Sequence, residues 1–156
     1  MRGPNELDQF GFFGELTIKT VRDGLVLREV GPFQNKVVSS SGYGRNLIMR
    51  ALAGDPTYSL AIDSAAIGDG SIAPADGDTG LGNSLVSGLP ITSAGVANNV
   101  LTIDVFVPSG DLPDDTYSEF GFFADGRLMS RVLISPAYTK AAGEDTLFSY
   151  TMTATG

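Results

Sequence analysis

The sequence predicts a mainly β fold, a two-sheet β-sandwich of antiparallel strands with one short helix near residues 42–53. Three observations lead to this prediction. Short stretches of β-type residues recur between turn signals along most of the chain. Aspartate outnumbers glutamate 13 to 5, and aspartate favours turns and caps whereas glutamate favours helices. Only one segment combines the apolar spacing of a helix with the signals that begin and end one.

The chain is interpreted as an N-terminal arm (1–14) followed by one β-sandwich domain (15–156), because 156 residues suit a single domain. In the arm, proline and polar residues lead into three phenylalanines beside glycines, Phe10, Phe12 and Phe13. Large apolar side chains in a terminal segment need a cover. That cover is either the core of the same chain or a neighbouring subunit. In the second case the three rings are anchors for a partner.

Residues 15–30 are expected to form a hairpin. Polar and apolar side chains alternate on either side of an Asp23-Gly24 pair, which is a strong signal for a tight turn between two strands. Gly31-Pro32 is interpreted as the end of this hairpin, because proline interrupts the ladder of a strand. A further extended piece is expected at 33–38.

Residues 42–53 are the segment expected to be helical. Serines at 39–41 are suitable N-caps, and Gly54 with the following Asp55-Pro56 pair stops the helix. The apolar residues at positions 47, 48, 51 and 52 share one face. Arg45 and Arg50 lie on the other flank. There they either form local ion pairs on a solvated surface or contact an acidic partner.

From residue 60 onward the pattern is β throughout. A long loop is expected at 68–83, an acidic turn at 109–115, and a second tight turn at Asp125-Gly126. The expected strands are 60–67, 85–92, 100–107, 117–123, 127–134 and 146–153.

The missing residue types exclude several classes of chemistry. The chain has no cysteine and no histidine, which removes disulfides, thiol nucleophiles, Ser-His-Asp triads and His-anchored metals. Its formal charge of −8 argues against nucleic acid or an anionic membrane as a partner. No apolar run approaches the ~18–20 residues of a membrane span. We therefore expect a protein that is not an enzyme and has no cofactor.

Two motifs are candidate sites for a cation or a phosphate. Asp76-Gly77-Asp78-Thr79-Gly80 resembles the opening of a calcium loop, but the later ligands of an EF-hand are missing. Aspartates that make Asx-turns are the simpler interpretation. Gly68-Asp69-Gly70 lacks the rest of a dinucleotide or phosphate-loop motif and is interpreted as a turn after a strand.

Glu119 is an unusual residue, because it is a carboxylate next to the apolar run 120–123. As a general acid it would need a second carboxylate, for which Asp63 and Asp104 are the strand-borne candidates. We favour the interpretation that Glu119 accepts backbone hydrogen bonds or pairs with an arginine, the candidates being Arg127 and Arg131. The five tyrosines (43, 58, 117, 138 and 150) are scattered, so packing is favoured over a sugar-binding face.

The order of several motifs is informative. They are NKVV (35–38) before the helix, AIGDG (66–70), AP (73–74), DTGL (78–81), YSEFGFF (117–123) and DGRLMSR (125–131). Together they resemble the small β-domains of tailed-phage virion proteins, in which a strand ending IaiGtG leads into aP…DT.L and then into an EiGlf…dG.l..R hairpin. The resemblance covers roughly residues 35–155, with mild departures at Asp69 and Phe120. Such domains occur in tail-fibre and collar proteins and in stand-alone particle components, so the resemblance implies a structural role without a catalytic residue.

We therefore expect a structural virion component, made in the bacterial cytoplasm and placed on the outer surface of the particle. The favoured form is an external decoration or cement protein, a homotrimer that clamps the major capsid protein. Its docking residues would be Phe10, Phe12, Phe13, Arg45 and Arg50. A tail, neck or fibre-base protein is one alternative. A host-glycan binding module, with the loops 68–83 and 109–116 as its rim, is the other.

Overall fold

The computed structural model describes residues 11–155, and this part of the chain is mainly β with one α-helix. The predicted fold class is confirmed at this level. The elements are β1 (Gly11–Arg22), β2 (Leu25–Val37), α1 (Arg45–Leu52), β3 (Ile62–Gly68), β4 (Ser84–Pro90), β5 (Ser93–Ala97), β6 (Val100–Val107), a 3₁₀ turn (Ser109–Asp111), β7 (Asp115–Ala124), β8 (Arg127–Lys140) and β9 (Asp145–Thr155).

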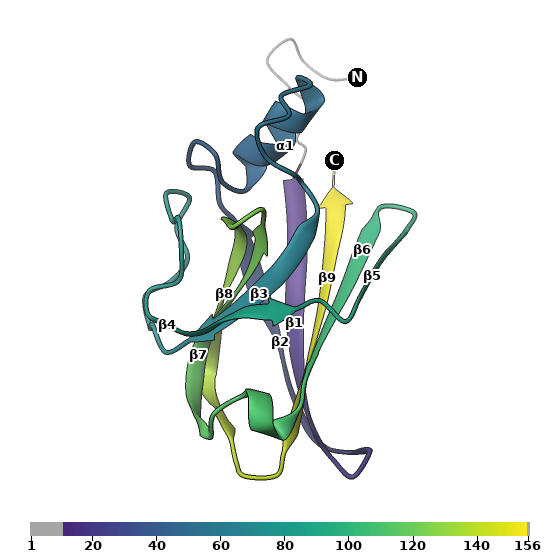
Figure 1. Ribbon diagram of the computed structural model, residues 1–156, viewed down its shortest axis with the longest axis vertical. Coiled ribbons are helices and arrows are strands. Elements are labelled where there is room, and N and C mark those ends of the chain that lie inside the picture. The colour runs from purple at the N-terminus through teal and green to yellow at the C-terminus, as the bar shows by residue number, and fades with distance from the viewer. Residues whose placement is uncertain (1–10, 156) are drawn as a thin grey trace, which may run out of the picture.

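The nine strands form one antiparallel sheet in the order β4-β3-β7-β8-β2-β1-β9-β6-β5, which curls into a half-barrel (Figure 1). The predicted division into two separate sheets is not confirmed. The reason lies in β2, which pairs with β1 over most of its length and with β8 through Asn35–Val37. This strand therefore joins the two halves of the sheet.

The interpretation of Gly31-Pro32 as the end of a strand was wrong. β2 continues through this dipeptide, and the pairing with β1 shifts register there, between Leu16 and Ile18. A bulge is the place where a strand tolerates a proline, because the missing N–H is not needed in the ladder. The extended piece expected at 33–38 is consequently the second half of β2.

The core fills the concave side of the curled sheet. Alternate residues of β1, β6 and β9 point inward, as the period of two requires. Its centre is aromatic: the rings of Phe120 and Phe148 are stacked at 4.7 Å, and those of Phe122 and Tyr150 lie 4.8 Å apart. All four side chains are fully buried. These aromatic contacts join β7 and β9, two strands that are not neighbours in the sheet, and so hold the half-barrel together.

Helix α1 is shorter than predicted and is less deeply packed. It begins at Arg45 because Gly44 has a positive φ of 52° and its Cα lies against the Val38 backbone, where no side chain fits. Of the predicted apolar face only Leu47 is buried. Leu52 is 77% exposed, so this face of the helix is only partly covered by the described residues.

The two ends of the described chain lie together. Gly11 pairs with Thr155, so the start of β1 and the end of β9 are at the end of the molecule that carries α1, and the β1–β2 turn is at the opposite end (Figure 1). Residues 11–14 of the predicted arm are part of β1, whereas Phe10 lies outside the described residues. No helix among the described residues is long and apolar enough to cross a membrane.

Candidate docking site

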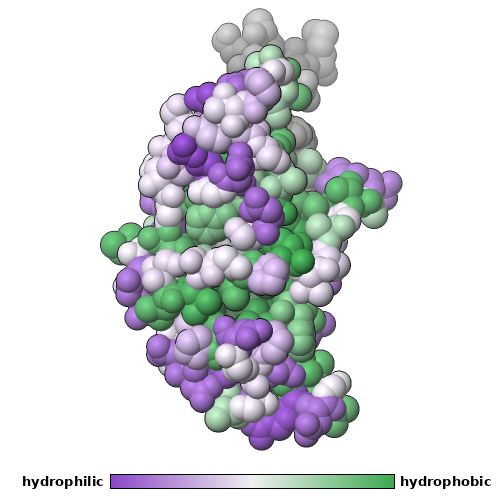
Figure 2. Space-filling model, in the orientation of Figure 1, coloured by the Kyte–Doolittle hydropathy of each residue, from purple (hydrophilic) through white to green (hydrophobic). Residues whose placement is uncertain are grey.

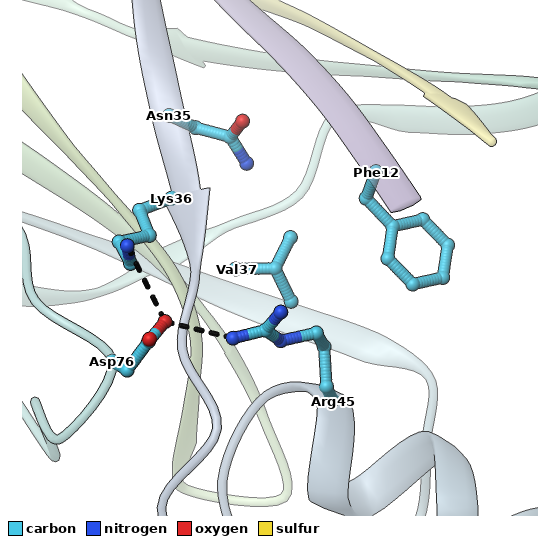
Figure 3. A pocket seen from close by; sticks show the side chains of 6 residues that line it. All are labelled: Phe12, Asn35, Lys36, Val37, Arg45 and Asp76. Carbon is cyan, nitrogen blue, oxygen red and sulfur yellow. Dashed lines mark hydrogen bonds and ion pairs between the residues drawn. The ribbon is translucent and has the colours of Figure 1, made fainter. Parts of the chain in front are cut away.

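Two of the predicted docking residues, Phe12 and Arg45, line the same cleft. Phe12 lies near the start of β1, and Arg45 is the first residue of α1. The cleft has a volume of about 200 Å³, and Figure 3 shows the residues that line it. They are Phe12, Asn35, Lys36, Val37, Arg45 and Asp76. Four segments therefore meet here: β1, the end of β2, the start of α1 and the loop 68–83.

The cleft carries two cations and one carboxylate. Asp76 Oδ1 accepts a hydrogen bond from Arg45 Nη2 at 2.7 Å and lies 3.4 Å from Lys36 Nζ (Figure 3). All three side chains are 43–58% exposed, so these ion pairs contribute little to folding. One positive charge remains in excess, on a chain whose formal charge is −8. Although the protein as a whole is acidic, the cleft is therefore locally positive and attracts an anionic group of a partner.

The loop 68–83 holds Asp76 in the cleft through fixed contacts. Ser39 N donates to the backbone carbonyl of Asp76 at 2.8 Å. Asp78 Oδ2 accepts from Ala75 N and from Arg131 Nη1, each at 2.9 Å. The Asp78 side chain thus bonds to the residue three positions before it and to a distant arginine, which differs from the predicted Asx-turn to the amide two residues further on. Among the residues that the structure describes, no three acidic side chains gather in the way a cation requires.

Two other predicted docking residues, Phe13 and Arg50, lie apart from the cleft. Phe13 is 46% exposed, because neighbouring residues of β1 point to opposite faces. Arg50 is occupied locally: its Nε donates to Asn46 Oδ1 at 2.7 Å and its Nη1 to Asp55 Oδ2 at 3.1 Å. Of the two interpretations weighed for Arg50, the structure shows the local ion pair.

Glu119 is fully buried on β7 and is surrounded by donors. Its carboxylate accepts from the backbone N–H groups of Gly70, Gly82 and Asn83, each at 2.7 Å. Arg131 Nε donates to it at 3.1 Å. The expectation that Glu119 accepts backbone hydrogen bonds and pairs with an arginine is confirmed, and Arg131 is the partner.

The pKa of Glu119 is set by two opposing effects. Burial alone would raise it, but the backbone N–H groups and the Arg131 guanidinium together outweigh burial and lower the pKa below its ordinary value of 4.5. A general acid at neutral pH needs a raised pKa and a free oxygen. Glu119 has neither. Glu119 therefore holds the loop 68–83 against the sheet. We call its contacts with Gly70, Gly82, Asn83 and Arg131 the Glu119 clasp.

A substitution at Gly70 tests how much the Glu119 clasp contributes to the stability of the fold. A methyl group at Gly70 would overlap the Glu119 carboxylate, which its four donors hold in place, whereas one at Gly80 in the same loop meets no atom within 4 Å. We expect Gly70→Ala to lower the free energy of unfolding by about 1–3 kcal/mol. Gly80→Ala should change it by about 0.5 kcal/mol or less. Urea denaturation of both variants is the measurement, and equal midpoints would contradict the role assigned to this clasp.

The tyrosines do not form a common face. Tyr117, Tyr138 and Tyr150 are buried. Tyr43 and Tyr58 both lie next to Arg127, whose guanidinium carbon is 4.9 and 4.5 Å from the two ring centroids. Arg127 was one candidate partner for Glu119, and it stacks on these rings instead.

Sequence reasoning missed four residues of the cleft, Asn35, Lys36, Val37 and Asp76. Lys36 was seen only as part of a motif, and Asp76 only as a candidate calcium ligand. A signal did exist, because Lys36 lies near the end of a predicted strand that precedes the helix, and Asp76 belongs to the long loop 68–83. Nothing in the sequence says that this loop folds back onto β2.

Comparison with known proteins adds no relative to this description. No family model, no curated protein and no solved structure matches the chain.

Proposed function

We propose that this protein is a structural component of a tailed-phage virion that acts through surface contacts and performs no chemistry of its own. Its favoured role is an external decoration protein that self-associates, as a trimer, and docks on the major capsid protein at the polar cleft. The resemblance of residues 35–155 supports the particle class. The meeting of Phe12 and Arg45 in one cleft supports the docking role.

The composition of the cleft defines the chemistry of its partner. Arg45 and Lys36 share a single carboxylate, so a partner carboxylate would find a cation that Asp76 does not fully neutralise. Phe12 and Val37 supply the apolar side of the same cleft. An exposed acidic loop with a neighbouring apolar side chain therefore fits this site. Such a pair of contacts is typical of a small interface with one anchor and a polar rim.

Binding to heads is the direct test. We expect Arg45→Ala to weaken binding to heads purified without this protein by about tenfold or more, because the partner carboxylate loses its cation. Lys19→Ala on the middle of β1 removes the same charge outside the cleft and is the matched control. Co-sedimentation over a range of concentrations measures both. Equal affinities for the two variants would rule out the cleft as the docking site.

A host-glycan binding module remains a second candidate, because a loop that was predicted as its rim contributes Asp76 to a cleft that also contains an aromatic ring. A glycan array probed with the purified protein distinguishes the two. Binding to a defined glycan that Arg45→Ala abolishes would favour this candidate. The placement in a tail, neck or fibre base belongs to the same particle class. The number of copies per virion separates it from the head, since a decoration protein is present in hundreds.

A further inference from the structure

We propose that copies of this chain associate head to tail, with the tip of the β1–β2 hairpin of one copy seated in an apolar slot on the open side of the next copy's half-barrel. The tip is defined as residues 22–28. This inference rests on the self-association in the proposed function and identifies the two surfaces that produce it. It can be tested with the purified protein alone, without any phage particle.

The slot lies where the curled sheet does not close. The start of β3 flanks it on one side and β5 on the other, and β6 and β9 lie behind it (Figure 1). Its volume is about 360 Å³, and hydrophobic residues gather on this face (Figure 2). The residues that line it are all apolar: Ile48, Leu60, Ala61, Ile62, Ala94, Leu101, Ile103, Met129 and Met152. With no polar side chain to orient a small ligand, the slot suits apolar protein side chains.

Both flanks of the slot offer free strand edges. β5 is the last strand in the sheet order, so one of its edges has no neighbouring strand among the described residues. β3 pairs with β4 only from Ser64 onward, so Ile62 is without a strand partner on that side within residues 11–155. Unpaired backbone N–H and C=O groups on a strand edge are satisfied best by another extended strand. The slot is therefore shaped for an extended apolar segment.

The tip supplies such a segment. Leu25, Val26 and Leu27 follow one another in β2 and are 69%, 57% and 51% exposed. On the side away from β1, the strand pairs of β2 begin only at Asn35, so no described strand covers the tip there. Three consecutive large apolar side chains on an exposed strand promote aggregation unless a partner covers them.

Polarity, not charge, matches the two surfaces. Asp63 and Asp104, the acidic residues of β3 and β6, do not line the slot: Asp63 accepts from the backbone N–H of Asp125, and Asp104 accepts from Ser149 on the other face of the sheet. Residues 22–28 contain two arginines and one aspartate. Arg28 has a carboxylate partner, whereas Arg22 donates to the backbone carbonyl of Ala142. In a contact between two tips the arginines would repel one another, and one hollow slot cannot fill another, so the contact between tip and slot is favoured over a contact of either surface with itself.

The position of the two surfaces determines the type of assembly. The tip is at one end of the molecule, and α1, which contributes Ile48 to the slot, is at the other (Figure 1). A contact between two different surfaces is heterologous, and repeated copies of it form a ring or an open chain. A twofold dimer, in which one surface pairs with itself, has a different signature in a mixing experiment.

The experiment uses two variants that each destroy one surface. Leu25→Asp places a charge on the tip, and Ala94→Asp places one in the slot, both at exposed positions. Sedimentation velocity should show the wild type as an oligomer and each variant as a monomer, with self-association weakened about tenfold or more. A one-to-one mixture of the two variants should sediment as a dimer, because one intact tip meets one intact slot and the assembly cannot extend.

Ile72→Asp is the control, because Ile72 is 76% exposed and belongs to neither surface. It should keep the size of the wild type. Far-UV circular dichroism confirms that each variant is folded, and Leu60→Asp replaces the slot variant if Ala94→Asp is not. A monomeric wild type, a Leu25→Asp variant that still self-associates, or a mixture that stays monomeric would each overturn the proposal. None of these outcomes bears on whether Arg45 binds the head.

Discussion

Replacing Glu119 with alanine is expected to lower the free energy of unfolding by about 3–5 kcal/mol, the usual cost of removing one partner from a buried ion pair. The structural reason is the number of donors that lose their acceptor. Gly70, Gly82 and Asn83 each lose a backbone hydrogen bond, and Arg131, whose side chain is 3% exposed, keeps only part of its charge compensation. Urea denaturation followed by circular dichroism measures the effect.

Glu29→Gln is a suitable control for this experiment, because Glu29 is an exposed carboxylate on β2. It should change the stability by about 0.5 kcal/mol or less. A loss below about 1 kcal/mol in Glu119→Ala would show that the loop 68–83 is held by other contacts and that the clasp is not an important anchor.

The same clasp predicts a dependence on pH. The pKa of Glu119 is lower in the folded chain than its ordinary value of 4.5, so the unfolded chain binds the proton more readily. The stability that Glu119 contributes is therefore fully present above pH 4.5, and it is lost as the pH falls through the folded-state pKa. We expect a shallower loss of stability in acid for Glu119→Gln than for the wild type. Parallel curves for the two proteins would contradict this assignment.

Phe148→Ala is the second substitution with a large expected effect, a loss of about 3–5 kcal/mol. Phe148 is fully buried, and its ring is stacked on that of Phe120 at 4.7 Å. Its strand, β9, lies between β1 and β6 inside the sheet, so the sheet cannot easily collapse into the cavity that alanine leaves. Thermal and urea unfolding both report the loss.

The matched control is Phe106→Ala on the neighbouring strand. Phe106 is 39% exposed and points away from the core, whereas its neighbour Val105 is buried opposite Phe148. The same aromatic truncation should cost about 1 kcal/mol or less at this position. Similar losses for the two phenylalanines would mean that the concave side of the sheet is not the main core.

The strands and their tight turns were predictable because they depend on neighbours in the sequence. The turns at Asp23-Gly24 and Asp125-Gly126 are confirmed, and all four residues have positive φ, between 52° and 77°. Aspartate followed by glycine is the pair that adopts such a turn at low cost, and its geometry matches the twist of the two flanking strands. The same local logic predicted the position of the helix to within a few residues.

The candidate sites were predictable only in part. Glu119 was recognised as a buried acceptor because a carboxylate beside an apolar run needs a partner, and Arg131 was one of the two partners proposed. Its backbone donors lie 36 to 49 residues away in the sequence. No local pattern identifies a loop amide as the ligand of a distant side chain. For the same reason, the polar cleft and the apolar slot were not predictable.

The sequence by itself determined where most of the strands lie, although it did not predict β5, and it determined that the chain contains no histidine or cysteine. The tertiary structure decided which strands are neighbours. The alternation of apolar residues along a strand indicates which side chains are buried, but it does not indicate which strand lies alongside. Pairs such as Gly11 with Thr155 join opposite ends of the described chain. One strand that passes through a proline bulge unites what the sequence predicted as two sheets into a single curled one. The open slot and the polar cleft both follow from that pairing.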